Sequence, residues 1–217
     1  MQTINKYKGI IFDIDGTLTS TFDLIFASFN YVMKKYLNKN YTNEEIVSLF
    51  GPTEDQILDK LCGENAEKAK EDYYSFYSEN HHMADLYPGI KELLEFIRSK
   101  NVYLSIYTGK GRKAASITLK KLEIFNYFDL IISGDEVKEH KPSPEGIELF
   151  IDKFNLQKEK VLMIGDAPTD IKAARAAGVE IASVLWDSYS KEQVLKLKSD
   201  YFFHSVSELS EFIKSNI

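Results

Sequence analysis

Short apolar runs alternate with longer, more polar stretches along most of the chain. β-Branched and aromatic residues predominate in these runs, which is typical of strands buried on both faces of a sheet. The five runs cover residues 8–13, 102–107, 129–132, 160–165 and 180–186. Together they predict one sheet of mainly parallel strands.

Three of the intervening stretches carry apolar residues at helical spacing. One helix is expected after Pro88 and another after Ser143-Pro144, because proline is favoured in the first turn of a helix. A third is expected over residues 168–177, where Gly178 can end it in the left-handed conformation. The alternation of strands and helices predicts a doubly wound α/β fold with a Rossmann-like sheet.

Residues 22–80 interrupt this alternation, because no strand-like run occurs in them. Apolar residues between Phe22 and Tyr36 repeat with the 3.6-residue period of a helix. Two capping-box patterns follow, at Thr42–Glu45 and Thr53–Gln56. This part of the chain is therefore expected to be entirely helical.

The position of this helical stretch predicts two domains. We expect a core domain of residues 1–20 and 86–217, interrupted by an inserted cap domain of residues 21–85, with hinges at 19–21 and 84–87. An insertion directly after the first strand would lie over the carboxyl edge of the sheet. Lids in that position exclude water and select substrates.

Composition narrows the possible partners. The chain has 217 residues, 44% of them hydrophobic, and can bury the core of a large domain with an insertion. Its net charge of -6 and its scattered basic residues argue against nucleic acid as a partner. Neither a signal peptide nor a membrane-spanning stretch is recognisable, so we expect a soluble cytoplasmic protein, as a monomer or weak dimer. The single cysteine, Cys62, is expected to be a buried thiol.

Two carboxylates, Asp13 and Asp15, close the first predicted strand. Their i, i+2 spacing on an extended chain points both side chains to one side, where they would repel each other. A divalent cation would relieve that repulsion. Open α/β sheets also gather ligands at the carboxyl ends of their strands. The sequence therefore predicts a metal-assisted carboxylate site near the N-terminus.

Three further motifs follow predicted strands or begin predicted helices. Thr108-Gly109 offers a hydroxyl and a close main-chain N–H to an anion, although Thr108 could instead cap the helix through Ala114. Lys141 precedes a proline and could equally be an exposed loop residue. Asp166 and Asp170 bracket the turn after the fourth run, where one of them could cap the next helix. Four acids and one lysine are thus expected at one edge of the sheet.

These motifs resemble those of a known superfamily. The segments Asp13-Ile14-Asp15-Gly16-Thr17-Leu18, Thr108, Lys141 and Gly165-Asp166 to Asp170 look, in order and spacing, like the four motifs of the haloacid dehalogenase superfamily. The helical insertion is similar to the small cap of its phosphoglycolate phosphatase and β-phosphoglucomutase branch. The resemblance implies a Mg²⁺-dependent phosphatase that forms an aspartyl phosphate and hydrolyses a small phosphomonoester.

The resemblance also implies a role for each motif residue. Asp13 would be the nucleophile, and Asp15 would be the general acid and base. Thr108, Gly109 and Lys141 would hold the phosphoryl oxygens, together with Gly16 and Thr17 of the first motif. The implied metal set comprises Asp13, Asp15 (through its main-chain carbonyl), Asp166 and Asp170, the last of which could instead orient Lys141.

The substrate is less sharply indicated. The turn Gly51-Pro52-Thr53-Glu54 is where related proteins place a substrate loop, although it could simply begin a helix. The cap contains no arginine, which weakens phosphoglycolate as a substrate because arginine commonly binds a second anionic group. His81 and His82, beside a hinge, are expected to be exposed.

Three alternative functions stay open on these residues, and a fourth is disfavoured. A phosphomutase would use the same residues while shielding the aspartyl phosphate from water. An inorganic pyrophosphatase would also fit the motifs. A non-catalytic module that binds metal or phosphate would keep the acids without turnover. Haloalkanoate hydrolysis is disfavoured, because a halide leaving group does not need the acid that Asp15 supplies.

Overall fold

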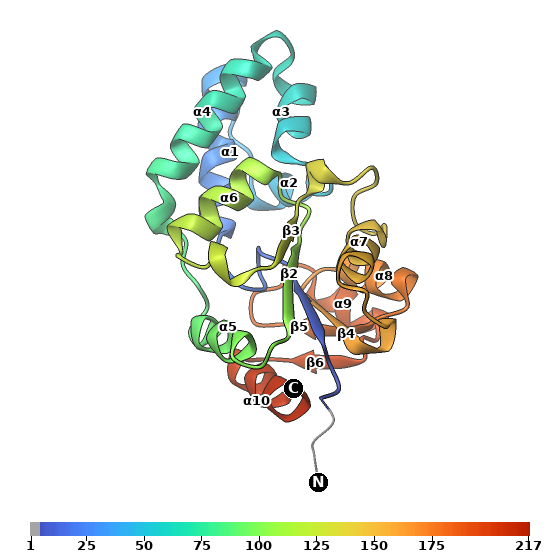
Figure 1. The fold of residues 1–217 in the computed structure, drawn as a ribbon. Helices are drawn as coiled ribbons and strands as arrows, with labels where there is room; N and C mark the ends of the chain where they lie inside the picture. The colour runs from blue at the N-terminus through green and yellow to red at the C-terminus, as the bar shows by residue number, and fades with distance from the viewer. Residues whose placement is uncertain (1–4) are drawn as a thin grey trace.

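The computed structural model describes residues 5–217, and a six-stranded parallel sheet forms its centre (Figure 1). The strands are β1 (Gly9–Phe12), β2 (Tyr103–Tyr107), β3 (Leu130–Ile132), β4 (Val161–Gly165), β5 (Glu180–Val184) and β6 (Tyr201–Phe203). Their order is β3-β2-β1-β4-β5-β6, and every neighbouring pair is parallel. This is the order of a doubly wound sheet, in which ligands bind where the direction of winding reverses. That point lies between β1 and β4.

Helices cover both faces of the sheet. The helices outside the insertion are α5 (Ile90–Arg98), α6 (Arg112–Lys121), α7 (Glu145–Phe154), α8 (Pro168–Ala177), α9 (Lys191–Leu197) and α10 (Val206–Asn216). Helices α5, α6 and α10 bury apolar residues in one core cluster with Ile10 and Phe12, whereas α7, α8 and α9 share the opposite cluster with Ile11. Alternate residues of β1 thus enter opposite layers. The predicted fold class is confirmed.

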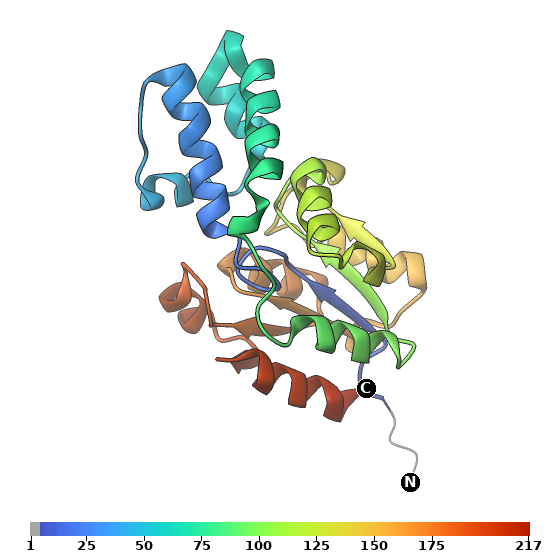
Figure 2. The same cartoon turned by 90° about the vertical axis from the view of Figure 1, so that its left-hand side faces the viewer.

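The insertion after β1 is helical throughout, as the sequence predicts. It contains α1 (Phe22–Leu37), α2 (Asn43–Val47), α3 (Glu54–Cys62) and α4 (Ala66–Glu79), which lie together beyond the sheet in Figures 1 and 2. Both predicted capping boxes form, at Thr42 and Thr53. We call α1 to α4 the helical insertion; the division into two domains at the stated boundaries stays a prediction.

The helical insertion has its own core and contacts α6. Its buried residues include Phe29, Leu58 and Tyr73, and Ala114 of α6 joins the same cluster. The Tyr77 and Thr118 hydroxyls are 2.7 Å apart, which ties α4 to α6. Cys62 is buried in this core as expected, and burial raises the pKa of its thiol.

The helices predicted from periodicity are confirmed closely. Helix α8 covers Pro168–Ala177, and Gly178 follows it at φ 75°. The interpretation of Thr108 as a helix cap is wrong, because α6 begins at Arg112 with Gly111 at its N-cap. The expectation that His81 is exposed is also wrong. Its side chain is buried edge-on against the Tyr77 ring, and burial lowers its pKa.

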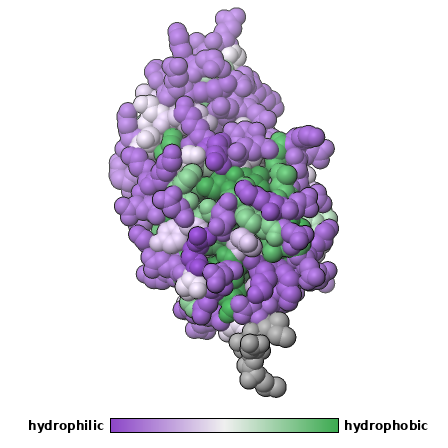
Figure 3. Space-filling view, viewed as in Figure 1, coloured by the Kyte–Doolittle hydropathy of each residue, from purple (hydrophilic) through white to green (hydrophobic). Residues whose placement is uncertain are grey.

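Short elements complete the chain. Single 3-10 turns occur at Gly63–Asn65, His81–Met83, Phe125–Tyr127, Gly134–Glu136 and Lys158–Lys160. Within residues 5–217, no helix combines the length and apolar character that a membrane crossing requires. Figure 3 shows mostly hydrophilic residues over the face seen in Figure 1, with apolar ones gathered near its middle.

Candidate active site

Three strand ends bring the motif residues to one edge of the sheet. Asp13 directly follows β1, Thr108 follows β2 and Asp166 follows β4, and all three are buried. The Asp13 N–H donates to the Ile164 carbonyl at 2.9 Å, which continues the pairing of β1 with β4 as far as Asp13. The fold therefore brings Asp13, Thr108 and Asp166 together at the carboxyl edge of the sheet, where the sequence predicts them.

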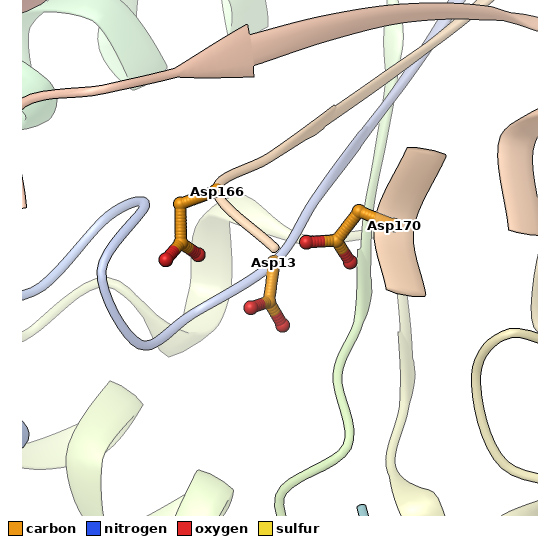
Figure 4. A group of neighbouring side chains, drawn as sticks. All are labelled: Asp13, Asp166 and Asp170. Atoms are coloured by element: carbon orange, nitrogen blue, oxygen red, sulfur yellow. The ribbon is translucent and has the colours of Figure 1, made fainter. Parts of the chain in front are cut away.

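Asp13, Asp166 and Asp170 form a compact group of buried carboxylates (Figure 4). One oxygen from each lies within 4.8 Å of the other two. Asp170 reaches the group from the first turn of α8, where its second oxygen accepts the Ala167 N–H at 3.0 Å. The i, i+4 spacing of Asp166 and Asp170 thus joins a strand end to a helix start at one point.

Lys141 is the cation of this group. Its ammonium lies 3.0 Å from Asp13 Oδ1 and 2.6 Å from Asp170 Oδ1, and it donates to the Tyr107 carbonyl at 3.1 Å. Burial alone would lower the pKa of Lys141, but Asp13 and Asp170 outweigh it and raise that pKa. Lys141 is therefore a buried, charged residue rather than an exposed loop lysine.

One lysine does not balance three buried carboxylates. Burial raises the pKa of Asp13 to about 6, despite the opposing effect of Lys141. Burial and the nearby charge of Asp13 raise the pKa of Asp166 well above its ordinary value, and its hydrogen bond from Thr17 Oγ1 (3.1 Å) offsets this in part. Excess buried negative charge with carboxylate oxygens in reach of one another is the donor set that a small hard divalent cation prefers. The residues present thus fit a divalent metal ion.

The Asp15 carboxylate points elsewhere. Lys110 Nζ lies 3.1 Å from each of its oxygens, and the Thr21 hydroxyl donates to Oδ1. Within the described part of the chain, the group of acids able to share an ion contains Asp13, Asp166 and Asp170 and not the Asp15 side chain. A metal role for Asp15 would therefore have to use its main-chain carbonyl, as the resemblance implies.

Lys110 is a site residue that sequence reasoning missed. It is 6% exposed and lies between Asp15 and Glu54, with Nζ 3.6 Å from Glu54 Oε1. The Tyr77 ring of α4 covers it, 5.1 Å from ring centroid to Nζ. Asp15 and the other acids outweigh burial and raise the pKa of Lys110. The sequence could have indicated Lys110 as a site residue only because it directly follows Thr108-Gly109. Nothing in the sequence links Lys110 to Glu54.

Glu54 reaches the sheet edge from the helical insertion. It is the first residue of α3, is buried, and accepts the Gly111 N–H at 2.7 Å. Burial raises its pKa, and Lys110 and the Gly111 hydrogen bond oppose that effect. Its neighbour Gly51 and Glu54 itself both line the cavity at the site, as expected for a substrate loop. Glu54 also begins a helix, so the two interpretations of this turn are compatible.

The remaining motif residues lie around the same point. Thr108 and Gly109 line the cavity, and the Thr108 hydroxyl accepts the Lys110 N–H at 3.3 Å. Gly16 has φ 78°, and a Cβ there would lie 2.6 Å from Asp166 Oδ2, so only glycine fits. Thr17 contacts Asp166 as described above.

A cavity of about 430 Å³ opens between the helical insertion and the sheet edge. Asp13, Asp15, Asp166 and Lys141 line it on one side, and residues of the helical insertion line it on the other. This volume is in the range of small-molecule sites. Acids and lysines beside a cavity of this size together form a site that could bind and transfer a phosphoryl group.

Comparisons with known proteins agree with this geometry. A family model described as haloacid dehalogenase-like hydrolase matches residues 10–184. A candidate pyrophosphatase PpaX of Caldanaerobacter subterraneus is 31% identical over 211 residues, which is 96% of each chain. Two solved structures superpose over nearly the whole chain.

The first is a predicted phosphoglycolate phosphatase of Haemophilus somnus, with a TM-score of 0.87 and 23% identity, covering 96% of this chain and 99% of that one. At this identity it shows the shared fold. The second is a candidate β-phosphoglucomutase of Thermotoga maritima, with a TM-score of 0.76 and 29% identity, covering 97% and 100%. The chain therefore belongs to the haloacid dehalogenase-like hydrolase family and is an enzyme of that class.

Proposed function

We propose that this enzyme is a Mg²⁺-dependent phosphatase that hydrolyses a small phosphomonoester through an aspartyl phosphate on Asp13. The observation that carries the proposal is the position of Asp13, buried beside two further carboxylates and 3.0 Å from the Lys141 ammonium. A carboxylate attacks a phosphate dianion only when nearby positive charge offsets their repulsion. Lys141 supplies part of that charge.

The carboxylates of Asp13 and Asp166 and the main-chain carbonyl of Asp15 would hold Mg²⁺. Asp170 would orient Lys141, whose Nζ is 2.6 Å from Asp170 Oδ1, or would join Asp13 and Asp166 at the metal site. When bound, Mg²⁺ would neutralise charge on the phosphoryl oxygens during transfer. The chain's own residues perform the proton and bond changes.

The first step forms a covalent bond between enzyme and phosphorus. An Asp13 carboxylate oxygen attacks the phosphorus atom, and the bond from phosphorus to the ester oxygen breaks. Asp15 donates a proton to that oxygen, so that the leaving group departs as a neutral alcohol. Thr108, Gly109 and Lys141 would hold the equatorial oxygens, with Gly16 and Thr17 completing the loop around them.

The second step regenerates the enzyme. The Asp15 carboxylate, deprotonated by the first step, accepts a proton from a water molecule as that water attacks the phosphorus. The bond between Asp13 and phosphorus breaks and inorganic phosphate leaves. One phosphomonoester and one water thus give one alcohol and one phosphate.

Phosphate release tests this proposal directly. The wild type is assayed on a panel of small phosphomonoesters with Mg²⁺ and with a chelator, beside Asp13→Asn. Mg²⁺-dependent release should fall in this variant by at least about 10⁴-fold, because no nucleophile replaces the carboxylate. Asp152→Asn, at an exposed aspartate of α7, is the matched control and should behave as wild type. Turnover retained by Asp13→Asn would refute the proposal.

Inorganic pyrophosphate is the second candidate substrate. A relative that is 31% identical along 96% of the chain is described as a pyrophosphatase, and the exposed Lys172 lines the cavity where a second phosphate could lie. Pyrophosphate in the same panel decides between the two. A higher kcat/KM for pyrophosphate than for every phosphomonoester would favour this candidate.

A phosphomutase or a non-catalytic module would give different results. Conversion of a sugar phosphate to its isomer without phosphate release would indicate a mutase. The absence of any turnover with Mg²⁺ would favour a module that only binds metal or phosphate. Location in the cytoplasm and a monomeric or weakly dimeric state stay predictions, which fractionation and sedimentation would test.

A further inference from the structure

Three aromatic side chains, which we call the aromatic wall, line the same cavity. The aromatic wall consists of Phe22 at the start of α1, Phe50 in the loop between α2 and α3, and Tyr189 between β5 and α9. The Phe22 and Tyr189 rings pack edge to face with centroids 4.5 Å apart, and Phe22 and Phe50 are 6.5 Å apart at an interplanar angle of 18°. Residues from three separate segments thus build one continuous apolar surface.

Part of this wall is exposed, although burying it would be favourable. Phe50 is 40% exposed and Tyr189 is 50% exposed, whereas Phe22 beneath them is 8% exposed. Large aromatic faces left open beside a cavity are typical of a surface that a ligand covers. Aromatic rings bind other rings through offset or edge-to-face contacts beyond simple area burial.

The aromatic wall begins at the phosphoryl site. Phe22 Cε2 and Asp166 Oδ2 lie 3.0 Å and 2.6 Å from the position that a Cβ on Gly16 would occupy. The Phe22 ring and the Asp166 carboxylate therefore both lie close to Gly16, in the loop that follows β1. A phosphate held at Asp13 would direct its ester group into the space that this wall borders.

The same space offers little positive charge for a second anionic group. All three arginines are engaged elsewhere: Arg98 with Asp129, Arg112 with Glu136, and Arg175 with the Lys198 carbonyl. Among the cavity lysines, Lys110 and Lys141 are already ion-paired with acids of the site. Within residues 5–217, Lys172 is the lining cation for which no ion pair is found. Glu54 adds a negative charge on the same side.

We propose that the leaving group of the substrate is an aromatic or heteroaromatic alcohol whose ring stacks on Phe50 and Tyr189. This inference rests on the proposed phosphatase activity and names its substrate class. The expected substrate is a phosphomonoester whose ring carries a phosphorylated hydroxymethyl group or similar short arm. Small polyanionic esters such as phosphoglycolate would bind poorly, because the wall offers them no partner.

Benzyl phosphate and ethyl phosphate form a matched pair for the test. Both are esters of a primary alcohol and differ mainly in the ring. We expect the wild type to show a kcat/KM at least about tenfold higher for benzyl phosphate, the gain expected from covering one aromatic side chain. In Phe50→Leu and Tyr189→Leu this ratio should fall toward one. Because both esters are measured on the same variant, any loss of folded protein cancels in the ratio.

Tyr103→Leu is the matched control for loss of an exposed aromatic residue. Tyr103 is 42% exposed and stacks on Phe154 at 4.2 Å, and it belongs to the opposite end of β2 from Thr108. Its benzyl to ethyl ratio should equal that of the wild type. A ratio near one in the wild type, or a ratio unchanged in both wall variants, would overturn the inference.

A binding measurement separates this inference from the proposed function. Benzylphosphonate and ethylphosphonate cannot release phosphate, so their dissociation constants with Mg²⁺ present can be compared by calorimetry. Tighter binding of benzylphosphonate, lost in Tyr189→Leu, supports the aromatic wall even if no ester is hydrolysed. Equal affinities would refute it even if hydrolysis of other esters establishes the phosphatase.

Discussion

Lys110 holds both carboxylate oxygens of Asp15, with its Nζ 3.1 Å from each. The other close neighbours of this ammonium, Glu54 and the Tyr77 ring, come from α3 and α4 of the helical insertion. The proposed general acid is thus held by a lysine of the sheet edge, and that lysine is enclosed by the insertion. The position of Asp15 and the seating of the insertion should therefore depend on each other.

Substitution of Glu54 by Gln tests this dependence through the leaving group. An alkoxide must be protonated as it leaves, whereas nitrophenolate is already a stable anion and needs no acid. Asp15→Asn should therefore lower kcat/KM for an alkyl phosphate by about 10²- to 10⁴-fold and lower that for p-nitrophenyl phosphate much less. We compare kcat/KM because it reports the steps up to departure of the leaving group and excludes the later hydrolysis of the aspartyl phosphate, in which Asp15 would also act. Glu54→Gln should show the same bias to a smaller degree, because it loosens Lys110 and leaves Asp15 in place.

Glu67→Gln is the control for this experiment. Glu67 lies on α4 and pairs with Lys70, and its side chain is 86% exposed. Exposed ion pairs of this kind contribute little to the stability of a protein. The kcat/KM values of this variant for both substrates should match those of the wild type. An equal loss on both substrates in Glu54→Gln would contradict the positioning role and indicate only a damaged site.

Removal of the Lys110 charge should destabilise the fold. In Lys110→Met, the buried carboxylate of Glu54 and the partly buried carboxylate of Asp15 lose their countercharge, so we expect the free energy of unfolding to fall by about 3 kcal/mol. Adding Glu54→Gln to this variant removes one of the two charges and should restore part of the loss. Urea unfolding in the presence of a chelator measures both. A cost below about 1 kcal/mol would mean that the pair behaves like an exposed one.

Sequence patterns located most of the fold and of the site for a definite physical reason. Strands buried on both faces are apolar throughout, so β1, β2, β4 and β5 were recognisable, and their carboxyl ends placed Asp13, Thr108 and Asp166 at one edge. Strands β3 and β6 are both three residues long; β3 was recognised from its aliphatic run Leu-Ile-Ile, whereas β6, with the sequence Tyr-Phe-Phe, was missed. Helices α9 and α10 were likewise left without a prediction.

Contacts between distant segments were beyond sequence reasoning. The Glu54 contact with Lys110 and Gly111 joins residues more than fifty positions apart, and no local pattern encodes it. Thr108 was a plausible helix cap by residue type, but the chain continues to Gly111 before α6 begins. His81 is polar and yet buried, because it lies against the Tyr77 ring of α4, and α4 in turn contacts α6. In each case, contacts made in the folded chain determine the surroundings of the side chain, and a local sequence pattern does not contain them.

Mg²⁺ should stabilise the protein more at neutral than at acidic pH. The folded-state pKa of Asp13 is raised from 3.8 to about 6, so the folded protein binds this proton more tightly than the unfolded chain. Without metal, the contribution of Asp13 to stability therefore falls as pH rises through that window, and the raised pKa of Asp166 acts in the same direction. Mg²⁺ binds the ionised carboxylates and so opposes this loss above the window.

Melting temperatures with chelator and with Mg²⁺ measure the effect. At about 100 times its dissociation constant, Mg²⁺ should add about 2.7 kcal/mol, or several degrees in Tm, at about pH 7.5 and clearly less at about pH 5. Asp166→Asn should raise Tm in chelator, because it removes a buried charge, and should reduce the Mg²⁺ response. A Mg²⁺ shift of equal size at both pH values would contradict the assignment of these acids.

Gly134 lets the loop after β3 pack against the proposed phosphate loop, and its replacement should be costly. A Cβ on Gly134 would lie 2.5 Å from the Gly109 carbonyl oxygen and 2.9 Å from Thr53 Cγ2. The first of these atoms belongs to the main chain and cannot turn away, so Gly134→Ala should lower the free energy of unfolding by about 1–3 kcal/mol.

Gly109→Ala is the matched control for stability, because a Cβ at Gly109 would meet no atom within 4 Å. Urea unfolding of both variants compares them, and equal stabilities would show that the loops can separate without cost. If Gly134→Ala instead weakens catalysis as well, the displaced Gly109 main chain accounts for it, since Gly109 is proposed to hold a phosphoryl oxygen.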